Sequence, residues 1–302
     1  MPSLIEANHV DQTVVERELR PAVIRTSQGD VEFVTWGKGP AVLSLHGAMG
    51  GYDQGVLLAR TVASPHFHFV SISRPGYLGT PLTSGRTPAE QADLCAEVLD
   101  HLGIGRAVLM AISGGGPTAL QFALRYAARC RGLVMLSACS DRLYEPVPRR
   151  WHVMKLIARI PGAAASMRKK VAKDPERAAQ RMIPDPVLRR RVLEDTETGP
   201  LFLSFHTELL ARMSSRIAGS DNDIRQTRAP EMSCALEQIE APTLVVHGTS
   251  DSIVPFAQAK ALASRVPGAE LLAIEGGEHA SIFTHRKEVR AGVDAFLDSL
   301  EK

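Results

Sequence analysis

Short apolar runs alternate with amphipathic segments along most of the chain. Most of the apolar runs are followed by a stretch with apolar residues at helical spacing. The apolar runs cover residues 41–45, 67–72, 108–112, 133–136, 243–246 and 270–274. Strands that alternate with helices in this way form crossover units. The pattern therefore predicts an α/β fold with a mostly parallel central sheet and helices on both of its faces.

The alternation stops near Asp141 and resumes at residue 243. Residues 142–240 lack a clear buried strand but contain apolar clusters at helical spacing, such as Met154, Ile157 and Ile160. We therefore predict a core made of residues 22–141 and 241–302, with a helical cap inserted at residues 142–240. Residues 1–21 are charged and weakly patterned, and we expect them to form an N-terminal arm.

Composition narrows the class of protein. The chain has 302 residues, 44% of them hydrophobic, which is enough for one large core with an appended element. A net charge of +2 is too small to indicate a nucleic-acid partner. The four cysteines show no metal-ligand spacing, as expected of a reducing compartment. The first residues lack a signal-peptide pattern and no apolar run is long enough to span a membrane, so we expect a cytoplasmic protein.

Ser113 lies where an apolar run gives way to a helical pattern, with Ala111 two positions before it and Gly115 two positions after it. This spacing is typical of a nucleophile elbow, a turn so sharp that side chains at the two flanking positions must be small. The serine is strained there, and its hydroxyl is exposed at the end of the strand. A phosphate-binding turn is the alternative, but the run lacks the Gly-x-Gly-x-x-Gly frame and a lysine beside Ser113.

Two further residues complete a candidate catalytic set. Asp251 follows the apolar run at residues 243–246, and His279 lies in the loop after the last predicted strand. A serine hydroxyl is a weak nucleophile until an imidazole takes its proton. The imidazole in turn needs a carboxylate that fixes its tautomer and stabilises its charge. The order Ser113, Asp251, His279 therefore predicts a catalytic triad.

The His46-Gly47 turn, the Ser113 elbow, Asp251 and His279 together resemble the α/β-hydrolase superfamily. The resemblance runs from about residue 22 to residue 300 and points to the serine-nucleophile, esterase-like branch with a helical cap. It implies Ser113 as nucleophile, His279 as base and Asp251 as its partner. It also implies that the backbone amide of Gly114 binds the oxyanion, together with the amide of Ala48 or, alternatively, Met49.

Other polar residues have simpler interpretations. We expect His46 and His247 to be structural members of turns. His285 is a rival of His279, but it lies within the closing helical pattern rather than in the loop. Asp221 and Asp223 fall in the predicted cap, and we expect both to be surface charges.

The sequence thus predicts a serine hydrolase that cleaves a carboxylic ester, or a related acyl bond, of a small to medium substrate. Met49, Trp151 and Phe205 are the candidate substrate-binding residues. Lactonase, thioesterase, amidase, carbon–carbon bond hydrolase and perhydrolase activities remain open, as does a small-molecule receptor without turnover. The resemblance implies no cofactor and no metal. We expect a small ester-like substrate as partner and no nucleic acid, and assembly into a homo-oligomer stays open.

Overall fold

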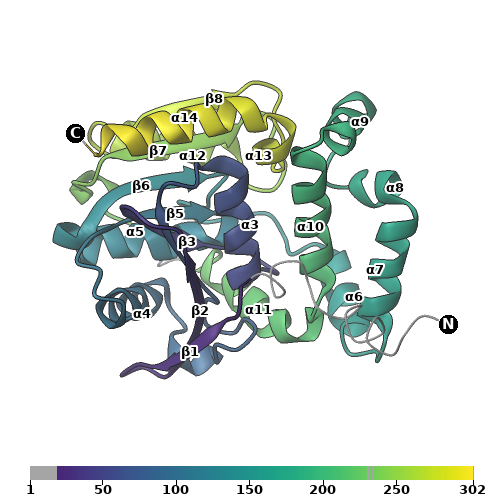
Figure 1. Cartoon of the computed structure of the whole chain (residues 1–302), viewed down its shortest axis with the longest axis horizontal. Coiled ribbons are helices and arrows are strands. Elements are labelled where there is room, and N and C mark those ends of the chain that lie inside the picture. The colour runs from purple at the N-terminus through teal and green to yellow at the C-terminus, as the bar shows by residue number, and fades with distance from the viewer. Residues whose placement is uncertain (1–18, 230–231, 233, 302) are drawn as a thin grey trace.

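A single sheet runs through the protein, which is represented by a computed structural model that describes residues 19–229, 232 and 234–301 (Figure 1). Its eight strands in the described residues stand in the order β1-β2-β4-β3-β5-β6-β7-β8. The strands are β1 (Ala22–Arg25), β2 (Asp30–Trp36), β3 (Ala41–Leu45), β4 (His68–Ile72), β5 (Ala107–Ile112), β6 (Cys130–Leu136), β7 (Thr243–Gly248) and β8 (Glu270–Ile274). β2 is antiparallel to β1 and to β4, and all other neighbours are parallel. The predicted mostly parallel sheet is confirmed.

Helices cover both faces of this sheet. The core helices are α3 (Tyr52–Val62), α4 (Pro88–His101), α5 (Gly116–Arg125), α12 (Phe256–Arg265), α13 (Ser281–Thr284) and α14 (Arg286–Ser299). Alternate residues of the central strand β5 point to opposite faces, as the strand period of two requires. Val108, Met110 and Ile112 pack with α3 and α14, whereas Leu109 and Ala111 pack with α4, α5 and α12.

The start of α4 follows from its local sequence. The side chain of Thr87 accepts a hydrogen bond from the amide of Glu90, and Glu90 in turn accepts one from the amide of Thr87. Pro88 occupies the first helical position, where its missing N–H costs nothing. This reciprocal capping box explains why the helix begins at Pro88.

Between β6 and β7 the described chain forms helices and no strand. These are α6 (Arg149–Ile157), α7 (Ala163–Lys173), α8 (Pro175–Ala179), α9 (Pro186–Glu194), α10 (Thr198–Leu210) and α11 (Ile217–Gln226). Short 3-10 turns are η1 (Leu82–Ser84), η2 (Ser113–Gly115), η3 (Ala127–Arg129), η4 (Met213–Arg216) and η6 (Leu236–Gln238). α10 lies against α3, whereas α6 to α9 form the outer side of the molecule (Figure 1).

Two buried ion pairs join these inserted helices to the core. Arg216, just before α11, pairs with Asp53 in the first turn of α3, and both side chains are fully buried. Burial alone would raise the pKa of Asp53, but the charge and hydrogen bonds of Arg216 hold it below its ordinary value. The second pair joins Arg74, after β4, to Asp223 in α11, with an Nη1–Oδ1 distance of 2.9 Å.

Asp223 therefore corrects the expectation of a surface charge. It is 6% exposed, and besides Arg74 it accepts a hydrogen bond from the hydroxyl of Tyr77 at 2.6 Å. Asp221, two residues earlier, is only half-buried and accepts hydrogen bonds from the indole of Trp151 and from Lys155. Residues two positions apart on a helix face different directions, so the carboxylates of Asp221 and Asp223 have different environments.

The N-terminal arm predicted at residues 1–21 falls mostly outside the described residues, which begin at residue 19. Among the described residues, every helix is too short or too polar to cross a membrane.

The Asp53–Arg216 pair yields a stability prediction. Arg216→Met leaves the Asp53 carboxylate buried without its main partner, so we expect it to lower the free energy of unfolding by about 3–5 kcal/mol. The double variant Asp53→Leu/Arg216→Met buries no charge and should be clearly more stable than the single variant. Urea denaturation followed by circular dichroism measures both. A double variant as unstable as Arg216→Met would show that side-chain packing, rather than the buried charge, dominates at this site.

Candidate active site

Ser113 occupies a strained turn between β5 and α5. Its φ is 51°, in the left-handed region that side chains other than glycine rarely adopt. The surrounding chain leaves little room for side chains. A methyl group on Gly115 would lie 2.7 Å from the carbonyl oxygen of Leu45, and one on Gly116 would collide with the carbonyl of Cys139. The turn geometry therefore explains the glycines after Ser113 and agrees with the predicted elbow.

Asp251 and His279 lie in the loops that follow β7 and β8, and the structure brings them together. Nδ1 of His279 is 2.8 Å from Oδ2 of Asp251. The other carboxylate oxygen of Asp251 accepts hydrogen bonds from the backbone amides of Ile253 and Val254, at 2.9 and 3.0 Å. Asp251 is buried, whereas His279 retains partial exposure. The carboxylate of Asp251 is thus fixed. It contacts Nδ1 of His279 and leaves Nε2 of that imidazole available to another group.

His247 is a second imidazole beside Asp251. Its Nε2 lies 3.3 Å from Oδ2 of Asp251 and donates to the carbonyl of Val254 at 2.9 Å. Burial would raise the pKa of Asp251, but the hydrogen bonds from His247 and His279 hold that pKa below its ordinary value. The structural role expected for His247 therefore includes a contact with the candidate acid, which its spacing of four residues from Asp251 could have indicated.

The loops carrying Asp251 and His279 are fixed to each other by backbone contacts. The amide of Ser250 donates to the carbonyl of Gly277 at 3.0 Å. A side chain on Gly248 would collide with the same carbonyl, so a glycine is required for the two loops to approach. Glu278 also bridges the loops, since it accepts a hydrogen bond from the hydroxyl of Ser252 at 3.0 Å. This close approach sets the separation of Asp251 and His279.

The loop after β3 lies beside the elbow. A methyl group on Gly47 would lie 3.0 Å from Cβ of Ser113, and one on Gly114 would lie 3.6 Å from the amide nitrogen of Ala48. Met49 has a φ of 59°, and its amide donates to the hydroxyl of Ser220 in α11 at 2.9 Å. The Met49 amide is therefore engaged by the inserted helices.

Asp223 is the residue near the elbow that the sequence interpretation missed. A methyl group on Gly114 would lie 3.0 Å from its Oδ2, so the carboxylate sits directly above this glycine. Arg74 holds the carboxylate from one side and also donates through Nε to the carbonyl of His46 at 2.9 Å. The sequence around Asp223 has the pattern of an ordinary polar helix, so nothing in it predicts a contact with Arg74 or with the turn at Gly114.

His46 is structural, as expected. Its Nδ1 donates a hydrogen bond to the carbonyl of Gly47 at 2.7 Å, and its Nε2 accepts one from the backbone amide of Arg74 at 2.9 Å. Burial, helped by the charges of Arg74 and Arg216, lowers the pKa of His46 well below its ordinary value. The ring is therefore neutral and links the loops after β3 and β4.

The remaining predicted residues occupy three different places. Trp151 is buried at the start of α6, where its indole donates to Asp221 at 2.8 Å. Phe205, in α10, packs edge-on against Phe283 of α13 with ring centroids 5.3 Å apart. Met49 packs on an apolar cluster between α6, α7 and η4 that includes Met213. Their role in substrate binding stays a prediction.

His285 differs slightly from its predicted position. It lies between α13 and α14 as the N-cap of α14, rather than inside the closing helix. Its Nδ1 is 2.9 Å from the hydroxyl of Thr284, and burial lowers its pKa.

Comparison with known proteins gives consistent matches. Residues 40–286 match the family described as the alpha/beta hydrolase fold. The pimeloyl (acyl-carrier protein) methyl ester esterase of Aromatoleum aromaticum is 27% identical over 84% of this chain and 91% of that protein. The poly(3-hydroxyalkanoate) depolymerase of Ectopseudomonas oleovorans is 27% identical over 77% of this chain and 76% of that protein.

Solved structures agree with this match. An alpha/beta hydrolase fold protein from Nakamurella multipartita superposes with a TM-score of 0.79 at 31% identity, covering 90% of this chain and 99% of that one. The enol-lactonase of Burkholderia xenovorans LB400, at 18% identity and a TM-score of 0.66, shares the fold and covers 92% of this chain. The sheet order, the strained turn after β5 and these matches lead to one conclusion: the chain belongs to the α/β-hydrolase fold family and is a hydrolase.

Proposed function

We propose that the protein is a serine hydrolase that cleaves a carboxylic ester through an acyl-enzyme. The observation that carries the proposal is the His279–Asp251 hydrogen bond at the carboxyl edge of a sheet whose strand β5 ends in the strained Ser113. The loops after β5, β7 and β8 emerge at the same edge because these strands are parallel. A relative named as a methyl ester esterase supports the choice of bond.

In this mechanism the oxygen of Ser113 attacks the ester carbonyl while Nε2 of His279 takes the hydroxyl proton. Asp251 keeps the His279 proton on Nδ1 and stabilises the imidazolium. The tetrahedral intermediate collapses, and the alcohol leaves with the proton from Nε2. Water then attacks the acyl-enzyme with His279 again as base, which releases the carboxylic acid and restores Ser113.

The amides of Gly114 and Ala48 are the donors we propose for the oxyanion. Ala48 is favoured over Met49 because the Met49 amide already donates to Ser220. The Ala48 amide nitrogen lies next to Gly114, on the side of the elbow where a side chain at Gly114 would point. Two fixed amides at this position would stabilise the charge that develops in the transition state.

We further propose that residues 142–240 act as a cap that selects the substrate. Ser220 and Asp223 of α11 reach the loop after β3 and the elbow, which supports a position above Ser113. Met49, Trp151 and Phe205 are the apolar side chains expected to contact the acyl or alcohol part of the substrate. A preference for short to medium acyl chains follows.

The nucleophile can be tested directly. A fluorophosphonate reagent should label the protein once, and Ser113→Ala should abolish the label and lower kcat by on the order of ten-thousand-fold or more. Ser137→Ala is the matched control, because Ser137 also follows a strand with a positive φ of 42°. The label and turnover of p-nitrophenyl acetate should survive in the control. Label on Ser113→Ala would disprove the assignment, and saturable ligand binding without turnover would indicate a receptor.

The base should appear in the pH profile. Only a neutral imidazole accepts the serine proton, so kcat/KM should rise with pH over the range in which the imidazole of the base loses its proton. Asp251 should add no second step in this range, since its pKa lies below its ordinary value and it stays ionised. His279→Ala should lose several orders of magnitude of activity, and His285→Ala should lose little. The reverse result would assign the base to His285.

Substrate selection can be read from a chain-length profile. Phe205→Ala and Trp151→Phe should change the ratio of kcat/KM for butyrate and octanoate p-nitrophenyl esters more than they change the rate on the acetate. Tyr144→Ala is the matched control, because this aromatic side chain of the same insertion is 77% exposed. An unchanged profile in both variants would show that the insertion does not select the acyl chain.

A further inference from the structure

The helices α6 and α7 carry an unusual share of the positive charge. Residues 149–173 contain eight lysines and arginines and no aspartate or glutamate. The remainder of the chain holds 27 basic and 33 acidic side chains, so its formal charge is negative. The near-neutral total of +2 therefore combines a strongly cationic segment at residues 149–173 with a negatively charged remainder of the chain.

Six of these cations are exposed, which makes them available to a partner. They are Arg149, Arg150, Arg159, Lys169, Lys170 and Lys173. Lys155 is partly buried and pairs with Asp221. The exposed cations lie on the outer side of the molecule, on α6, α7 and the turn between them (Figure 1).

An apolar stripe runs among these cations. Val153, Leu156 and Ile160 follow each other at helical spacing and are 56%, 64% and 56% exposed. They do not belong to the side of α6 that packs inward, because Met154 and Ile157 face the cluster around Val171 and Met213. A soluble surface rarely gathers large aliphatic side chains in this way without a partner.

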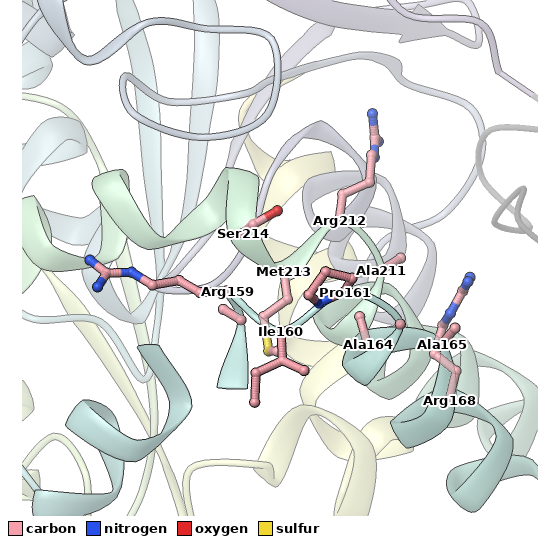
Figure 2. A pocket seen from close by; sticks show the side chains of 12 residues that line it. Arg159, Ile160, Pro161, Ala164, Ala165, Arg168, Ala211, Arg212, Met213 and Ser214 are labelled. Atoms are coloured by element: carbon pink, nitrogen blue, oxygen red, sulfur yellow. The ribbon is translucent and has the colours of Figure 1, made fainter. Parts of the chain in front are cut away.

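A pocket opens beside the stripe. It has a volume of about 750 Å³ and lies between the α6–α7 turn and η4 (Figure 2). Ile160 and Met213 line it, with Arg159 and Arg168 at its sides. Met213 also belongs to the apolar cluster that includes Met49 of the loop beside the elbow. The wall of the pocket therefore includes both Ile160 of the stripe and Met213 of the cluster on which Met49 packs.

We propose that this α6–α7 face, formed by the six exposed cations and the Val153-Leu156-Ile160 stripe, docks on an anionic phospholipid surface. Aliphatic side chains would enter the boundary of the acyl chains, while lysines and arginines would meet the phosphate groups. An anionic membrane would therefore contact both the cations and the apolar stripe of the face. The docked protein would present the pocket at Ile160 to the lipid, so that apolar esters dissolved there could enter.

A second copy of the chain or a nucleic acid would complement the α6–α7 face less completely. A second copy placed symmetrically on it would bring two strongly cationic surfaces together, which is repulsive. A nucleic acid would match the charge but leave the aliphatic stripe against phosphates, and the exposed apolar residues of the stripe are not the aromatic side chains on which bases stack.

Binding of the full chain to vesicles tests the proposal without using turnover, so its result is independent of the proposed esterase activity. Co-sedimentation should detect binding to phosphatidylcholine vesicles that contain phosphatidylglycerol, and little binding to phosphatidylcholine alone. The binding should weaken as salt is raised. A lysine beside an anionic leaflet contributes a factor of about five, so K169Q/K170Q/K173Q should weaken binding by on the order of a hundredfold.

The matched control removes the same charge elsewhere. K38Q/K260Q/K287Q changes three exposed lysines outside the α6–α7 face and should bind almost as well as the wild type. Leu156→Ser should weaken binding by about tenfold while keeping the salt dependence. All of these positions are exposed, and thermal melts should confirm unchanged folding.

Several results would overturn the proposal. These are equal binding to neutral and anionic vesicles, equal losses in the two lysine triples, or an unaffected K169Q/K170Q/K173Q variant. Binding of duplex DNA that depends on the same lysines, in the absence of vesicle binding, would assign the face to nucleic acid instead. A dimer in light scattering that Leu156→Ser dissociates, again without vesicle binding, would assign it to a second copy.

Discussion

Two buried arginines determine how the inserted helices meet the core. A guanidinium taken out of water is tolerated only when a carboxylate and further hydrogen-bond acceptors surround it. Arg216 meets Asp53 of α3, and Arg74 meets Asp223 of α11, so each pair contains one residue of the core and one of the insertion. Because unpaired partners would be costly, the pairs fix α11 against the loops after β3 and β4. The environment of Ser113 depends on that placement.

The strained turn at Ser113 depends on the same neighbourhood. A residue at φ 51° is held there by its surroundings, and here these are the carbonyls of β3 and of the segment after β6, which leave no space beside Gly115 and Gly116. Asp223 closes the remaining side above Gly114. Gly114 after Ser113 and the buried carboxylate of Asp223 from the insertion thus lie in one arrangement.

The sequence predicted those features that local chemistry decides. The strand runs, the sharp turn at Ser113 and the loops of Asp251 and His279 are each specified within a few residues. The structure has them where the pattern indicated. Asp223 could not be placed in this way, because its partner Arg74 is 149 positions away and nothing near either residue marks the pairing. The candidate substrate residues share this difficulty. Whether Trp151 or Phe205 faces a substrate depends on the packing of several helices.

The net charge of the whole chain does not reveal the cationic and apolar α6–α7 face. A formal charge of +2 argues against a polyanionic partner only if the charge is evenly spread, whereas here one acid-free stretch of two helices carries it. In the same way, the apolar residues of α6 fit a helix that packs inward, but the structure divides them between two sides. Met154 and Ile157 pack inward, while Val153 and Leu156 remain in contact with solvent, as does Ile160 in the turn after the helix. A helix that is apolar on both sides and cationic around them is suited to a boundary between an apolar phase and anions.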